Sequence, residues 1–463
     1  MKKKILLITP LATPEERTPK GLRIPEIALC IIASFTPEEH FDVEIIEEEI
    51  EDIDFNKECD IVGISCMTAN ANRAYYIGSE FKKRGKTVVY GGIHPTVLPN
   101  EALQHGNAVI VGEAEGVWEE FLKDYLNGNI KQIYRSYQPD VSNYPIPKRK
   151  MSKGKGIFNV QPILTTRGCP YDCNFCSVPE FYGKKLRHLP TEKVVADIKS
   201  SGANIFLFLD DNVIGHPPYA KDLFRAMIPL KIKWVGQASI SFVQNEELMK
   251  LAQASGCGAL FFGLESVSTS QLKKMRKSIK EISKVEDAIK RVKDLGIHFH
   301  ASLVLGFDDD TEAVFEETLE FLMRNKIGTI SCNILTPYPG TQIHRQFDAE
   351  KRLLTKNWNY YDHGTVVFKP KNMTPLQLAE GHNWVRREFY KFSSIARRLS
   401  GNLSHPLLYL AMNMGGRVTT KREFLALHGK MDIIMNDSLK LYQSENKLID
   451  TRVFDDISLV SKE

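Results

Sequence analysis

Three cysteines lie close together in the stretch RGCPYDCNFCSVP, at residues 167 to 179. Cys169, Cys173 and Cys176 are separated first by three and then by two residues. A short loop with this spacing can present three thiolates to separate iron atoms of a cubane cluster. With three protein ligands, the fourth iron of a [4Fe-4S] cluster stays open to another molecule. The loop therefore predicts a cluster that can bind a small molecule directly.

A zinc site and a chance grouping of thiols are also compatible with the residues of the cysteine loop. Zinc would need a fourth ligand, for which His188 is the candidate, although zinc ligands usually come as two separated pairs. The three residues could equally be reduced thiols that lie near one another by chance. The remaining five cysteines are isolated in apolar contexts, as expected of buried, reduced thiols in a cytoplasmic protein.

The composition of the chain is that of an ordinary globular protein. It has 463 residues, of which 43% are hydrophobic, and a formal net charge of +4. Because the charge is small and its runs are short and of opposite sign, nucleic-acid binding is not indicated. The apolar run in MKKKILLITP is too short for an export signal, and no segment reaches the ~18 apolar residues of a membrane span. We expect a cytoplasmic enzyme.

Residues 1–127 alternate short apolar runs with helical patterns, which predicts a doubly wound, Rossmann-like α/β domain. Ligands of such domains bind beyond the carboxyl ends of the strands. Residues 128–160 contain several Pro, Gly and Lys and predict a linker. The expected strands of the domain are KILLI, DVEIIE, DIVGISCMT, TVVYGG and AVIVGEAEG.

A second series of strands and helices fills residues 161–345. Six such units predict a partial (β/α)6 barrel of the TIM type, with reactive groups at the carboxyl ends of its strands. The cysteine loop follows the first of these strands, at that edge. The expected strands are PILTTRG, IFLFLDD, KWVGQAS, ALFFGLES, HFHASLVLGF and TISCNILTPYPG.

The C-terminal part, residues 346–463, is predicted to be mainly helical. Apolar residues there follow one helical stripe, which favours packing on the core. Arginines and lysines lie elsewhere on the same expected helix, so peripheral contact with a membrane also stays open. The stripe consists of Val385, Phe389, Phe392, Ala396 and Leu399.

Cys169, Cys173, Phe175 and Cys176 match the CxxxCxφC signature, with φ aromatic, of the radical S-adenosylmethionine (SAM) superfamily. The chain resembles that superfamily. The resemblance implies that the open iron binds SAM, and that one electron from a reductant such as flavodoxin or ferredoxin releases a 5′-deoxyadenosyl radical. The protein would then position SAM and exclude water and oxygen.

The resemblance also suggests where SAM is bound. Phe175 would flank its adenine. Carboxylates can accept from the ribose hydroxyls or the SAM ammonium, and amides or hydroxyls can serve its carboxylate. Each candidate alone could also be a loop or helix cap, but their recurrence at four strand ends favours a shared site. The candidates are Asp210, Asp211, Gln237, Ser239, Glu265 and Ser302. No catalytic residue is assigned.

Four stretches of the first domain, GLRIPE, GISCMT, YGGIHPTVLPNEAL and VGEAEG, resemble the cobalamin-binding domain of one radical SAM subfamily. Glycines at the strand ends would let the backbone approach a flat ligand, and hydroxyls could bond its polar groups. The cobalt-ligating motif DxHxxG is absent after the first strand, where LLITPLATPEERTPKG stands. Cobalamin would therefore bind without a protein histidine as a ligand of its cobalt, or the domain has kept the fold and lost the cofactor. The candidate contacts are Ser65, Thr68, Gly91, Gly92, His94 and Glu113.

Residues 358–378, WNYYDHGTVVFKPKNMTPLQL, resemble the C-terminal extension of subfamily members that act on lipids and isoprenoids, including hopanoid methylases. The implied function is cobalamin-dependent C-methylation at an unactivated carbon of a hydrophobic small molecule or lipid. A radical enzyme without cobalamin that closes a ring or joins carbons on a lipid is one alternative. A zinc-stabilised binding protein is another. The substrate and the oligomeric state are not readable from the residues.

Overall fold

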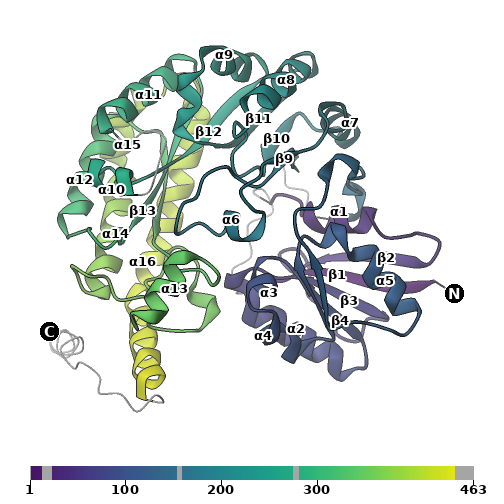
Figure 1. Ribbon diagram of the computed structural model, residues 1–463. Coiled ribbons are helices and arrows are strands. Elements are labelled where there is room, and N and C mark those ends of the chain that lie inside the picture. The colour runs from purple at the N-terminus through teal and green to yellow at the C-terminus, as the bar shows by residue number, and fades with distance from the viewer. Residues whose placement is uncertain (1, 13–22, 154–158, 275–280, 444–463) are drawn as a thin grey trace.

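Two parallel sheets of six strands each form the frame of the protein. The computed structural model describes residues 2–12, 23–153, 159–274 and 281–443. In Figure 1 the first sheet lies at the lower right and the second curves across the top and left, with the short helix α6 (Val178–Phe181) between them. The predicted α/β architecture of two parallel sheets followed by helices is confirmed.

The first sheet is doubly wound because its apolar runs are buried on both faces. Helices α1 (Ala28–Ser34) and α5 (Trp118–Leu126) pack on one face, and α2 (Ala71–Lys83) and α4 (Pro99–His105) pack on the other. The short helix α3 (Ile93–Val97) follows the fourth strand. In spatial order the strands are β2 (Phe41–Glu47), β1 (Lys3–Thr9), β3 (Ile61–Ser65), β4 (Thr87–Gly91), β5 (Ala108–Gly112) and β6 (Ile133–Ser136).

Strand β6 lies inside the expected linker of residues 128–160, so the expectation of a plain linker there was wrong. It pairs in parallel with β5 and completes the first sheet. A run of only four residues, with an exposed Arg135 in the middle, carries too little apolar pattern to be recognised as a strand.

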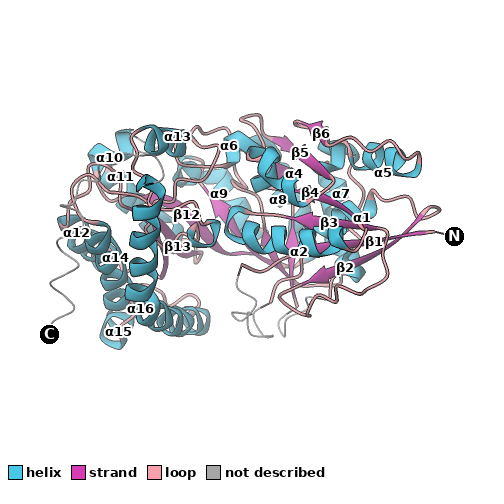
Figure 2. Ribbon diagram, turned by 90° about the horizontal axis from the view of Figure 1, so that it is seen from below, coloured by secondary structure: helices cyan, strands magenta, loops and turns pink. Residues whose placement is uncertain are grey.

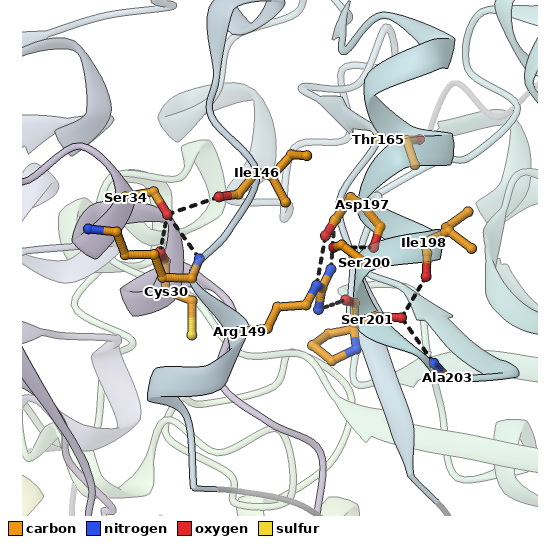
Figure 3. A network of polar contacts seen from close by, with 12 residues as sticks. Cys30, Ser34, Ile146, Arg149, Thr165, Asp197, Ile198, Ser200, Ser201 and Ala203 are labelled. Atoms are coloured by element: carbon orange, nitrogen blue, oxygen red, sulfur yellow. Dashed lines mark hydrogen bonds and ion pairs between the residues drawn. The ribbon is translucent and has the colours of Figure 1, made fainter.

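The rest of the linker is fastened to both parts of the molecule (Figure 3). The Ser34 hydroxyl of α1 donates to the carbonyl of Ile146 and accepts from the amide of Lys148. The Arg149 guanidinium donates two hydrogen bonds, of 2.8 and 2.7 Å, to the carboxylate of Asp197 in α7 (Thr191–Ser201). Bidentate pairs of this kind fix orientation as well as distance. The linker is therefore a clamp between the first sheet and the barrel.

The second sheet is the predicted half-barrel, whose neighbouring strands follow one another in the chain. Its helices cover the convex face, and the concave face forms the inside of the barrel (Figures 1 and 2). The strands are β7 (Val160–Ile163), β10 (Ile205–Phe208), β11 (Lys233–Ala238), β12 (Cys257–Glu265), β13 (His298–Leu305) and β14 (Thr329–Ile334). The helices are α7, α8 (Pro217–Met227), α9 (Glu246–Ala254), α10 (Thr269–Lys274), α11 (Ile282–Asp294) and α12 (Ala313–Arg324). A two-stranded hairpin, β8 (Thr166–Arg167) and β9 (Arg187–His188), brackets the cysteine loop.

A row of polar side chains lines β13 and β14 inside the barrel. His298 Nε2 and His300 Nδ1 lie 2.9 and 2.8 Å from the Thr329 hydroxyl, and His300 Nε2 lies 2.9 Å from the Ser331 hydroxyl. Burial lowers the pKa of His298 to about 4 and that of His300 to about 3. Both imidazoles are therefore neutral near pH 7, which lets each ring use one nitrogen as a donor and the other as an acceptor.

The open edge of the barrel, along β14, is covered by side chains of the C-terminal helices. The Tyr390 hydroxyl donates to the Ile330 carbonyl at 3.0 Å, and His382 Nε2 lies 2.7 Å from the Cys332 carbonyl. Arg398 donates to the two carbonyls that precede the strand. The helices are α13 (Gln342–Ala349), α14 (Pro375–Phe389), α15 (Phe392–Leu399) and α16 (Pro406–Gln443).

The expectation of one helix with an apolar stripe over 385–399 was wrong. Val385 and Phe389 are buried in α14, but the chain leaves the helix at Tyr390 and Lys391 has an extended backbone. Because α15 then begins with a new rotation, Phe392 and Ala396 are exposed. The buried face of α15 is instead Ser394, Ile395 and Arg398.

An aromatic segment of the C-terminal part packs on the first sheet's helices. Trp358 and Tyr361 are buried in the same core as α2. Trp358 Nε1 donates to a Glu101 carboxylate oxygen at 2.8 Å. The extension therefore contacts both sheets.

The neutral histidines predict a pH dependence of stability. His300 has an ordinary pKa of 6.5 and a folded pKa of about 3, so below pH 6.5 the unfolded chain takes up a proton that the folded chain does not. Folding stability therefore falls as the pH falls. In His300→Asn, the loss of unfolding free energy between about pH 6.5 and 5 should shrink by about 1.5 kcal/mol, measured by denaturant titration at both pH values. Thr329→Val, which removes hydrogen bonds but no titrating group, should keep the wild-type pH dependence; an unchanged slope in the Asn variant would contradict the argument.

Candidate active site

The cysteine loop is anchored by its own non-cysteine residues. Tyr171 places its hydroxyl 3.2 Å from that of Ser241, beyond the end of β11. The Asn174 carbonyl accepts a hydrogen bond of 3.1 Å from the amide of Ile343 in α13. The Phe175 ring packs against the barrel core. These contacts come from three different elements and fix the loop at the mouth of the barrel.

The three cysteines of the loop are half-buried thiols. Burial raises the pKa of Cys176 to about 12, so an unliganded thiol there keeps its proton, which a metal would displace on binding. Within the described parts of the chain, no three His, Cys, Asp or Glu residues converge on a single-ion site. A four-iron cluster does not need its ligands to converge on one point, because each cysteine binds a different iron atom.

A cleft of about 1150 Å³, measured out to its open mouth, lies at the carboxyl edge of the first sheet. Its floor is formed by the ends of β1, β3, β4 and β5, and its wall on the barrel side by Arg167, Phe181 and Tyr182. Arg167 lies two residues before Cys169. The cleft and the cysteine loop are therefore adjacent. The strand-end residues that line the floor include Leu7, Thr9, Gly63, Ser65, Val89, Gly91, Gly92, Ile110, Gly112 and Glu113.

Four buried charges join the cleft floor to the cysteine loop. Arg187 donates to Glu113 at 2.6 Å, and Arg167 contacts Glu113 at 3.4 Å and Glu115 at 2.5 Å. The Arg167 guanidinium also lies over the Tyr182 ring, 5.1 Å from its centroid. Burial raises the pKa of Glu113, and the hydrogen bond from Arg187 opposes that shift. We refer to Glu113, Glu115, Arg167 and Arg187 as the interface ion cluster.

Comparison with known proteins places this geometry in a family. Residues 163–322 match the Radical SAM superfamily, and residues 20–122 match the B12 binding domain. The bacteriochlorophyllide d C-12(1)-methyltransferase of Chlorobaculum tepidum is 32% identical over 421 residues, covering 86% of this chain and 90% of that protein. The chain belongs to the cobalamin-dependent radical SAM methyltransferases.

Other members of the family are more distant. The hopanoid C-3 methylase of Methylococcus capsulatus is 25% identical, over 74% of this chain and 72% of that protein. The cobalamin-dependent radical enzyme OxsB, solved with aqua-cobalamin and S-adenosylmethionine bound, has the same fold, with a TM-score of 0.66 over 99% of this chain and 80% of that chain at 16% identity. The zinc-stabilised binding protein is thereby set aside.

The cleft of this methyltransferase fits the cobalamin that its family uses. A Cβ on Gly91 would meet no atom within 4 Å, so the bare strand end opens onto the cleft. At Gly92, φ is 108° and a Cβ would lie 2.6 Å from the Cys66 carbonyl oxygen, so only glycine is accommodated there. The buried Nε of Arg167 has no partner in the protein, which leaves a donor for a carbonyl of the ligand's amide side chains.

Two predicted cobalamin contacts do not line the cleft, which corrects the expectation for them. His94 is fully buried beneath the sheet edge, with Nδ1 3.3 Å from the Thr68 hydroxyl and Nε2 3.4 Å from Glu101. Its ring also packs edge-on against Trp358. His94 and Thr68 therefore belong to the contact between the first sheet and the extension. The residues that could replace the missing DxHxxG motif, 13–21, lie outside the described residues.

The predicted SAM residues gather at the carboxyl edge of the barrel, except for one. Gln237 on β11 is exposed to the inside of the barrel, and Ser302 is half-buried on β13, with β12 between the two strands. Glu265 has a φ of 63° at a register shift of β12, a strained backbone of the kind that re-aims a side chain next to a site. Ser239 already contacts Tyr171 and Ser241, so it also positions the cysteine loop.

Asp210 is the exception. Its carboxylate is fully buried and accepts hydrogen bonds from the amide and hydroxyl of Thr165 and from the hydroxyl of Thr166. It therefore fixes the ends of β7 and β8 instead of facing a ligand. Asp211, the next residue, is half-buried, and burial, with the charge of Asp210, raises its pKa to about 7.

The interface ion cluster was missed in the sequence, apart from Glu113. Arg167 stands in the quoted motif directly before Gly168 and Cys169, and that proximity was the available signal. Arg187 is twenty residues further along, and only the hairpin of β8 and β9 brings it next to Arg167. Its role could be seen only in three dimensions.

Replacing a loop cysteine tests the cluster site. Cys173→Ala should lose the iron–sulfur absorbance and SAM cleavage, because one of three ligands is gone. Iron and sulfide, measured after anaerobic reconstitution, should fall well below about four per chain. Cys257→Ala removes a buried thiol in β12 and should retain both the metal and the cleavage. Full activity in Cys173→Ala would overturn the assignment.

Filling the bare strand end tests the cleft. Gly91→Val should abolish most cobalamin binding, because its side chain enters the space above β4, where an added Cβ meets no protein atom within 4 Å. Stability should change by no more than about 0.5 kcal/mol. Gly258→Val in β12, where a Cβ meets only the Trp234 carbonyl at 3.8 Å, is the matched control and should bind cobalamin normally. Bound cobalamin is read from the visible spectrum after gel filtration; equal loading of both variants would refute the cleft as the site.

Proposed function

We propose that this methyltransferase transfers a methyl group to an unactivated carbon of a largely apolar substrate, lipid-like or isoprenoid-like, held between the two carboxyl edges. The cleft over residues 1–127 would hold cobalamin, and the barrel of residues 161–345 would hold the cluster and SAM. The C-terminal part, residues 346–463, would complete the substrate space. When bound, these cofactors supply the radical and the methyl group.

The adjacency of the cleft and the cysteine loop is the observation that carries this proposal. Arg167 lines the cleft, and Cys169 follows two residues later. A substrate carbon between them is therefore within reach of both cofactors. Proximity of this kind converts encounters between separate reactants into steps inside one complex.

The chain's own residues would bind and orient the reactants. In the proposal Cys169, Cys173 and Cys176 hold the cluster. Phe175 packs beside the SAM adenine, a position supported by its ring contact with Phe307 at the end of β13. The polar groups of SAM are received by Asp211, Gln237, Ser239, Glu265 and Ser302.

Ser65, Gly91, Gly92 and Glu113 are the proposed cobalamin contacts of the first domain, together with Arg167. All five line the same cleft. A small reduced protein such as flavodoxin or ferredoxin would supply the electrons. Peripheral contact with a membrane would give access to a lipid-like substrate.

The test is product analysis under anaerobic conditions. The reconstituted enzyme is incubated with SAM, a reductant, cobalamin and a candidate apolar substrate, and the products are followed by mass spectrometry. Formation of both 5′-deoxyadenosine and S-adenosylhomocysteine, with a substrate one methyl group heavier, is the expected result. Formation of 5′-deoxyadenosine alone, with a cyclised or coupled substrate, would instead establish the alternative radical chemistry.

A further inference from the structure

The outer face of α15 and α16 carries large apolar side chains exposed to solvent. Leu407, Val418 and Leu425 are 81%, 61% and 77% exposed. They fall on one side of α16, because the spacing from Leu407 through Met414 and Val418 to Leu425 is seven, four and seven residues. We call Leu407, Leu410, Met414, Val418 and Leu425 the α16 stripe. Over eighteen residues it extends ~27 Å along the helix.

The stripe lies on the helix face opposite to the one that packs on the protein. The inward face of α16 is made by Tyr409, Asn413, Leu427, Met431 and Ile434, all buried. Because this buried face already holds the helix in place, the stripe is not needed for its packing. An exposed apolar face of this length marks an interaction surface.

Phe392 at the start of α15 extends the apolar surface sideways. It is 60% exposed, and the Arg417 guanidinium of α16 lies over its ring, 4.2 Å from the centroid. The aromatic side chain and the stripe therefore belong to one continuous face made by two helices.

The charge around this face is mainly positive, because Glu423, the acidic residue within the span of the stripe, is ion-paired with Arg386. Residues 389–422 contain six Lys and Arg residues and no Asp or Glu, although the chain as a whole has 61 basic and 57 acidic residues. Lys421 lies within the stripe between Val418 and Leu425, and Arg397 and Arg422 are also exposed. Apolar side chains bordered by cations are complementary to anionic lipid headgroups above an acyl layer.

We propose that this face of α15 and α16 docks on an anionic lipid surface. The apolar stripe enters the boundary between headgroups and acyl chains, and the flanking cations bind the headgroups. With one face of α16 apolar and the opposite face packed on the protein, the helix would lie in the plane of the surface. No helix among residues 2–12, 23–153, 159–274 and 281–443 is long and apolar enough to cross a membrane. The proposal rests on the proposed function only in that an apolar substrate gives the contact a purpose.

Vesicle sedimentation tests the docking. The full chain is mixed with vesicles of phosphatidylcholine alone or with about one-third phosphatidylglycerol, a range in which each surface cation adds to binding. Binding to the anionic vesicles, weakened by salt, is expected. Leu407→Glu/Val418→Glu should reduce the bound fraction at least about tenfold. The control Leu126→Glu/Ile228→Glu, which adds the same charge at exposed apolar sites of α5 and the barrel rim, should bind like wild type.

Two results would overturn the proposal. One is equal vesicle binding by the stripe variant, the control and the wild type, or no binding by any of them. The other is a wild-type dimer in solution, measured by light scattering, that the stripe variant converts to monomer, because a second copy would then cover the face. SAM cleavage without vesicles, measured on the same preparations, should be equal in all three proteins, so a failure of docking is distinguishable from a failure of the proposed function.

Discussion

The interface ion cluster holds the two carboxyl edges of this enzyme against each other. Two arginines from the barrel side meet two glutamates from the first sheet, all largely removed from water. Removing one partner of such a set leaves an uncompensated buried charge, at a cost of about 3–5 kcal/mol. Since Arg167 is joined to Cys169 by a single residue, the same contacts set the position of the cysteine loop over the cleft. The distance between the two cofactor sites therefore depends on this group of charges, together with the linker and the extension that also join the two parts.

The parts of the structure that periodic patterns control could be predicted from the sequence. Continuous apolar runs between helical segments are typical of parallel strands, and the carboxyl ends of parallel strands meet at one edge. The six strands of the barrel and the position of the cysteine loop follow from these two rules. The match of Cys169, Cys173, Phe175 and Cys176 to the radical SAM signature needed no tertiary information at all.

Residues whose role depends on a partner far along the chain could not be predicted. Asp210 and Asp211 are neighbours, yet Asp210 is fully buried against Thr165 whereas Asp211 stays partly exposed. His94 was a candidate cobalamin contact, but Trp358 from the extension packs against its ring. No Gly or Pro marks the end of α14 at Tyr390 in the sequence. The Tyr390 hydroxyl instead forms hydrogen bonds with the main chain of Ile330 in β14, a contact that the local sequence does not reveal. In each case the deciding contact spans dozens of residues.

The side chains that cover the β14 edge have a consequence for how such enzymes diversify. A seventh strand would tie the extension to the barrel through a fixed main-chain register, in which one insertion shifts every pair. Tyr390, His382 and Arg398 instead make separate contacts from helices. Substitutions in the covering segment can therefore change these contacts one at a time, while the main-chain hydrogen bonds between the barrel strands stay intact. The occupied carbonyls also deny a template to a strand of another molecule, which protects an unclosed barrel from edge-to-edge aggregation.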